Sequence, residues 1–268
     1  MNHQSVLCIS MLFHFGTLFA QTTDLNELVR KIDVRTKAYP EFLSYTATAV
    51  SRSWEMNAQW KPEKEVVVTK RIVQHQDSAQ GIRIDETVIR AVEIIQGREK
   101  DVTEKMKGTV KKRRAKQRRT GPEDGDGKGK RRGQGFSMSN DDIYPFGEKK
   151  KNLFRFTQLA DTAIGGKSFL RIQAEAKVPD QETYEGRFTI DRETYDVLLM
   201  DVQPSKNPKF VKRITMQMEF DVLPGPYIVL KRFWMLLDAS LLIKKIRMEF
   251  EETHSDVRVT GPAGASDP

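Results

Sequence analysis

Residues 184–195, YEGRFTIDRETY, alternate apolar and polar side chains over their first eight positions. One face would carry Tyr184, Gly186, Phe188 and Ile190, and the other Glu185, Arg187, Thr189 and Asp191. Successive side chains of a strand point to opposite faces of its sheet, so this pattern is typical of a strand with one buried face. It predicts a half-buried β-strand over 184–191, followed by a turn.

Similar segments recur on both sides of this stretch. We expect further strands at 45–54, 65–75, 81–90, 91–96, 153–160, 167–177, 197–202, 214–220, 228–236 and 243–252. Neighbouring strands that each carry one apolar face predict an antiparallel sheet, which must curl or be covered. Ahead of them, Asp24 is a candidate N-cap for a helix with Leu25, Leu28, Val29 and Ile32 at helical spacing, and Pro40 predicts its end near Tyr39.

The positive charge of the chain is concentrated in one segment. The formal net charge is +8, yet residues 105–132 alone have a balance of +10 and the remaining chain has −2. Residues 104–135 contain almost no large apolar side chain, which predicts a mobile insertion between two structured halves, with room for a solvated helix up to Arg119.

The basic residues of this insertion are candidates for contact with an anionic membrane surface or an acidic partner. They are Lys111, Lys112, Arg113, Arg114, Lys116, Arg118 and Arg119. No aromatic residue stands among them to stack on bases, which argues against a nucleic-acid partner. The competing interpretation is a solvated variable loop without a partner.

The first 20 residues have the length and hydrophobicity of a signal peptide. We therefore expect export to the periplasm, with an uncleaved membrane anchor as the alternative. Cys8 lies inside this segment and is the single cysteine of the chain, so the mature protein would have no disulfide. Residues 21–259 are expected to form one domain, and 260–268 a disordered tail.

Several of these stretches resemble the LolA-like family of outer-membrane lipoprotein-sorting proteins. Residues 184–195 resemble the family's G-R-hydrophobic-W-I-D-x-E-T-Y strand and turn, with Thr189 in place of the tryptophan. Tyr144-Pro145-Phe146, the turn at Gly165-Gly166-Lys167 and residues 207–212 add to the resemblance, whereas residues 222–240 depart from the family pattern. The resemblance implies an α+β fold in which a curved, unclosed antiparallel sheet (a half-barrel) wraps around one or a few helices.

It also implies a non-enzymatic carrier whose apolar concavity holds lipid or lipoprotein acyl chains. Large apolar residues expected on the inner face are the candidate lipid-binding residues: Phe188, Ile190, Met216, Met218, Phe220, Trp234, Met248 and Phe250. The competing interpretation is that they form an ordinary core. The alternative function is an envelope interaction protein, in which the sheet is only a scaffold for the basic loop.

The sequence contains no motif for catalysis, a cofactor or a metal. His75 and His254 are the histidines that follow the signal segment, and we expect both to be exposed at strand ends rather than metal ligands. Gly165-Gly166-Lys167-Ser168 lacks the first glycine of a P-loop, because Asp161 stands at that position. We therefore expect a binding protein without catalytic residues and without a cofactor.

Overall fold

The computed structural model describes residues 24–39, 43–77, 81–119, 144–180, 182–225, 227–241 and 244–261. The expected signal segment, the insertion beyond residue 119 and residues 262–268 of the expected tail lie outside these ranges. The elements are α1 (Leu25–Lys37), β1 (Ser44–Met56), β2 (Pro62–Asp77), β3 (Gly81–Ile95), β4 (Arg98–Asp101), α2 (Thr103–Arg119), the 3₁₀ turn η1 (Lys151–Leu153), β5 (Phe154–Ile164), β6 (Lys167–Ala176), β7 (Tyr184–Asp191), β8 (Val197–Pro204), β9 (Val211–Leu223), β10 (Tyr227–Leu241) and β11 (Lys244–Thr260).

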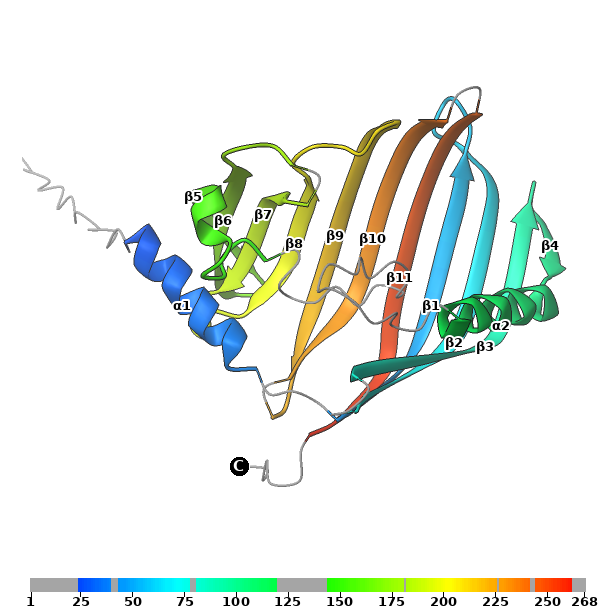
Figure 1. The fold of residues 1–268 in the computed structure, drawn as a ribbon, viewed down its shortest axis with the longest axis horizontal. Helices are drawn as coiled ribbons and strands as arrows, with labels where there is room; N and C mark the ends of the chain where they lie inside the picture. The colour runs from blue at the N-terminus through cyan, green and yellow to red at the C-terminus, as the bar shows by residue number, and fades with distance from the viewer. Residues whose placement is uncertain are drawn as a thin grey trace, which may run out of the picture.

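All 11 described strands belong to one antiparallel sheet, in the order β4-β3-β2-β1-β11-β10-β9-β8-β7-β6-β5. Every neighbouring pair is consecutive in the chain except β1 and β11. The two outer strands, β4 and β5, do not pair with each other, so the sheet is open (Figure 1). The expected fold class, an unclosed antiparallel sheet with helices, is confirmed.

The strand boundaries follow the alternation of the sequence, with local corrections. β7 has the predicted bounds, whereas the two strands expected over 81–96 form the single strand β3. The short strand β4 was not expected, because its four residues, Arg98–Asp101, are all charged and exposed. The solvated helix that residues 99–119 had room for is present as α2, so this part of the expected mobile insertion is helical.

The two helices cover opposite ends of the sheet. The apolar side of α1 places Leu28, Val29 and Ile32 in a large core with residues of β5–β10. Phe146, which is fully buried, packs edge-on against Phe188 of β7 at a centroid distance of 5.0 Å. At the other end, α2 packs on β3 in a cluster whose buried members are Val88, Ala91 and Val102.

Among the described residues, no helix combines the length and the apolar composition needed to cross a membrane.

Candidate functional site

One row of directly paired residues crosses the sheet from the α1 end to the α2 end. It runs Ile172, Phe188, Met200, Met218, Phe233, Glu252, Ser51, Val68 and Ala91, from β6 to β3. Directly paired residues in antiparallel strands share one face of the sheet. The first members of the row pack against α1 and the last against α2, so both helices lie on the same face. Figure 1 shows strands β9, β10, β11 and β1 between the two helices.

Apolar side chains continue along this face between the helices. Met235 pairs with Phe250, and Leu237 pairs with both Met248 and Ile214. All five side chains are only partly buried, unlike Phe188 or Met218 under α1. We call these five residues on β9, β10 and β11 the central strip. It is an apolar surface that borders the packed core on one side.

The eight candidate lipid-binding residues fall into three groups. Phe188, Ile190, Met216 and Met218 are buried in the core that α1 covers, and Phe220 packs against that core while partly exposed. Met248 and Phe250 belong to the central strip. Trp234 lies on the opposite face, away from both helices.

The position of Trp234 follows from the alternation of β10. Its neighbours Phe233 and Met235 are directly paired with Met218 and Met216 of the core, so Trp234 must point the other way. Its indole Nε1 donates a hydrogen bond of 2.6 Å to Glu249 Oε1 on the polar face. Trp234 therefore does not share the inner face on which the sequence analysis placed it.

Beside the central strip, four ionisable side chains form a connected cluster on the same face, the charge cluster. Lys70 Nζ lies 2.9 Å from Glu86 Oε1 and 2.9 Å from Glu252 Oε2. Glu252 Oε1 in turn lies 2.9 Å from His254 Nε2. Two hydroxyl groups complete the network: Ser51 Oγ donates to Glu252 at 2.5 Å, and Tyr45 OH lies 2.6 Å from His254 Nδ1.

The ionisable groups of this cluster stabilise one another's charged forms in a largely buried setting. Burial alone would raise the pKa of Glu252, but the hydrogen bond from His254 and the charge of Lys70 outweigh it and lower the pKa to about 2. Burial would lower the pKa of Lys70, and the carboxylates of Glu252 and Glu86 raise it instead. Burial raises the pKa of Tyr45, which keeps its hydroxyl protonated and able to donate to His254.

The expectation of two exposed strand-end histidines was half right. His75 is exposed near the end of β2, but the side chain of His254 is only 7% exposed within β11. The physical reason is that both ring nitrogens of His254 have partners inside the sheet, Glu252 and Tyr45. No pattern along the chain brings residues 45, 70, 86, 252 and 254 together, because their contact depends on the register of three strand pairs.

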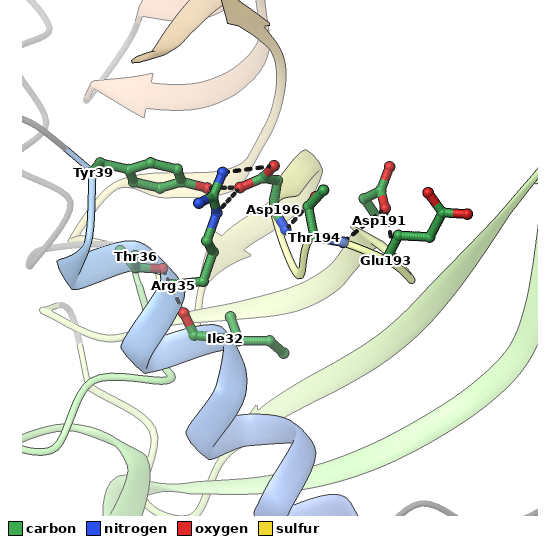
Figure 2. A network of polar contacts seen from close by, with 8 residues as sticks. All are labelled: Ile32, Arg35, Thr36, Tyr39, Asp191, Glu193, Thr194 and Asp196. Carbon is green, nitrogen blue, oxygen red and sulfur yellow. Dashed lines mark hydrogen bonds and ion pairs between the residues drawn. The ribbon is translucent and has the colours of Figure 1, made fainter. Parts of the chain in front are cut away.

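A second polar network ties the end of α1 to the turn between β7 and β8 (Figure 2). Arg35 Nε lies 2.5 Å from Asp196 Oδ1, and Tyr39 OH donates to the same oxygen at 2.6 Å. Asp196 is nearly fully buried. Burial would raise its pKa, but hydrogen bonds from Arg35, Thr194 and Tyr39 lower the pKa below its usual value.

The turn itself is closed by a short acidic side chain. Asp191 Oδ1 accepts hydrogen bonds from the backbone N–H groups of Glu193 at 2.8 Å and Thr194 at 3.1 Å. This Asx-type turn presents Asp196 to Arg35. Strand β7 and the turn that follows it therefore also position α1 over the core.

The basic residues of the insertion lie on α2. Lys111, Lys112 and Arg113 are exposed on it, and Arg114, Lys116, Arg118 and Arg119 belong to the same helix. They are separate from the charge cluster, whose residues lie on β1, β2, β3 and β11.

Among the described residues, no group of three or more His, Cys, Asp or Glu side chains could hold a metal ion. Two hollows lie away from the strip: one, with a mainly polar lining, is on the opposite face around Arg187 and Asp201, and the other, with a mixed lining, is beside Arg90 and Lys100 near the start of α2. The central strip is instead a partly exposed apolar surface next to the charge cluster.

Three of the solved structures of similar architecture illustrate the likeness. An outer membrane lipoprotein-sorting protein domain from Vibrio parahaemolyticus is 13% identical, with 90% of this chain and 94% of that chain covered and a TM-score of 0.43. A DUF1329 family protein from Desulfovibrio piger is 11% identical, with 91% and 96% covered and a TM-score of 0.38. A LolA superfamily protein from Nitrosomonas europaea is 8% identical, with 88% and 93% covered and a TM-score of 0.31.

No protein-family model and no curated protein sequence matches the chain. The likenesses to solved structures concern the fold alone. The unclosed antiparallel sheet with helices on one face is the LolA-like architecture that the sequence resemblance implied.

Proposed function

We propose that the protein is a non-enzymatic carrier that holds lipid or lipoprotein acyl chains against the central strip. The observation that supports this most is the contrast along a single face. Under α1 the apolar residues are buried, whereas Met235 and Phe250, which pack against the edge of that core, and Leu237 and Met248 beyond it stay partly exposed. A contiguous apolar surface that stays partly open to solvent is a place where a ligand or partner can bind.

The composition of the strip suits a flexible apolar ligand. Methionine side chains are unbranched and adapt to irregular shapes, and Met235 and Met248 flank Phe250 and Leu237. Each methylene of an acyl chain removed from water contributes roughly 0.8 kcal/mol. A chain of ordinary length could thus be held without a deep cavity if it lay along the strip.

The charge cluster would face the polar end of such a ligand. Glu252 follows Phe250 by two positions on the same face of β11, so the polar and apolar surfaces adjoin. Lys70, Glu86 and His254 offer both donors and acceptors there. An amphiphile lying across this border would match both surfaces.

A periplasmic location agrees with this role. The segment 1–20 has the features of a signal peptide, and an acyl chain that crosses an aqueous compartment must be shielded from water. The export signal and the location remain part of the proposal.

A pair of neighbouring leucines provides the test. Leu237 belongs to the central strip, whereas Leu236 pairs with Thr215 and Glu249 on the opposite face. We expect the Leu237→Gln variant to lose lipid seen by native mass spectrometry and to bind a fluorescent fatty acid more weakly. The Leu236→Gln variant should retain both properties. Equal behaviour of the two variants, or wild-type protein that takes up no fatty acid, would contradict the proposal.

A further inference from the structure

Helix α2 uses its apolar side entirely for packing on the sheet. Val102, which precedes its first residue, is buried against β3, and Met106 and Val110 follow at helical spacing in the same cluster. Apart from Ala115, the described side chains on the other sides of the helix are polar and mostly basic. Lys105, Lys107, Lys111, Lys112 and Arg113 are all exposed.

The charge of α2 is poorly compensated within the helix. Its 17 residues contain nine Lys or Arg and one acid, Glu104. Among the described residues, Glu104 forms an ion pair of 2.8 Å with Lys107. The pairs Lys107–Lys111 and Lys112–Lys116 place like charges four residues apart, a spacing that destabilises a helix by a few tenths of a kcal/mol per pair. An external anionic surface would relieve this repulsion.

We propose that α2 docks the protein on the surface of an anionic lipid bilayer. Charge complementarity supports this: α2 has a formal balance of +8, which equals the net charge of the whole chain, so the remainder is formally neutral. Each base held near an anionic bilayer contributes to binding without a requirement for shape. The described outward side of α2 has no aromatic side chain and no aliphatic one larger than Ala115, so it lacks the large anchors of a protein interface and the stacking groups of a nucleic-acid site.

The position of α2 gives this docking a direction. The helix lies on the same face of the sheet as α1 and the central strip (Figure 1). Contact through α2 would therefore turn that face, rather than the opposite polar face, toward the bilayer. This inference goes beyond the carrier proposal, because α2 could dock the protein whether or not the central strip holds a lipid.

The test uses the full chain and vesicles of phosphatidylcholine with and without phosphatidylglycerol. Wild-type protein should sediment with the anionic vesicles alone, and less so as the salt concentration rises. Changing Lys111, Lys112 and Arg113 together to glutamine should weaken binding by about 100-fold, given roughly fivefold per lost base. A second variant with glutamate at the same positions also adds negative charge and should show a larger loss.

A matched control separates the site from the overall charge. Lys206, Lys209 and Lys212 are exposed in and next to the loop between β8 and β9, and changing them to glutamate alters the net charge equally. This control should bind anionic vesicles far better than the α2 variant. Equal losses in both triple variants, undiminished binding by the α2 variants, or wild-type binding to nucleic acid or an acidic protein but not to vesicles would each overturn the proposal. If the α2 variants lose vesicle binding but still take up fatty acid, the docking proposal is upheld independently of the carrier function.

Discussion

The two ends of the sheet each carry a helix on the same face, yet they are built differently. At the α1 end, aromatic and long aliphatic side chains from six strands bury one another, with Phe146, Phe188 and Ile172 fully enclosed. At the α2 end, the described cluster has three buried members, Val88, Ala91 and Val102. Helix α1 is held by a large buried core and by the Arg35–Asp196 ion pair. Helix α2 packs on the sheet through a small apolar cluster, and most of its other residues are basic.

The two ends should therefore differ in what they contribute: the α1 end mainly to stability, and the α2 end mainly to the charge of the surface. Buried apolar area is the main favourable contribution to folding, so the α1 end should contain most of the free energy of unfolding. The α2 end has few buried contacts, and regions of that kind open at lower free energy. The charge cluster lies between the two ends and forms the border of the central strip.

The largest expected effect comes from the α1 end. Phe188→Ala should lower the free energy of unfolding by about 3–5 kcal/mol, because it leaves a cavity among Phe146, Ile172 and Met200. Urea denaturation would measure the loss. Val88→Ala at the α2 end is the control and should cost markedly less, since it removes a smaller side chain. If the two costs were equal, the proposed division between the ends would be wrong.

An intermediate loss of stability is expected from the charge cluster, which borders the central strip. Glu252→Gln should cost about 2–3 kcal/mol at neutral pH, because it weakens hydrogen bonds to a charged acceptor from Ser51, Lys70 and His254. The pKa of Glu252 is lowered from 4.5 to about 2, so its carboxylate stabilises the folded state above pH 4.5. That contribution should disappear as the pH falls from 4.5 to 2.

Denaturation of both proteins across this pH range would check the prediction. The gap in unfolding free energy between wild type and Glu252→Gln should narrow as the solution becomes more acidic. A gap that stayed constant down to pH 2 would show that Glu252 does not gain its stability from these partners.

The smallest effect is expected in α2. Met106 is partly exposed, so Met106→Ala should cost only about 1 kcal/mol, below the range for fully buried methionines. Hydrogen exchange should show faster opening of α2 with little change under α1. Faster exchange throughout the sheet would mean that the two ends unfold as one unit, and would contradict the lower stability expected for the α2 end.

The local patterns of the sequence predicted the elements well, because alternation and capping act over a few residues. Asp24 caps α1 as expected, with its carboxylate accepting from the Asn26 N–H at 3.0 Å. Strand β7 was placed at both ends from its alternation alone. The charged strand β4 was missed, since it is an exposed outer strand with no apolar face to reveal it.

The candidate site was predicted less completely, for a different reason. Phe250 and Met248 were identified from their alternation, but their neighbours Met235 and Leu237 in the central strip were not singled out. Trp234 was expected on the inner face, whereas the parity along β10 places Met235 there instead. Lys70 and Glu252 are 182 positions apart, and only the pairing of β1 with both β2 and β11 brings them together.

That pairing has a consequence for the order in which the molecule can assemble. Strands β1–β4 and strands β5–β11 each pair with their own chain neighbours, and β1 with β11 is the single junction between the two sets. Its partners, such as Ser51 and Glu252, are about 200 residues apart, so the junction must wait until nearly the whole chain is present. Contacts this distant in sequence slow folding. Until β11 pairs with β1, the two sets of strands therefore expose the backbone edges that this pairing later covers.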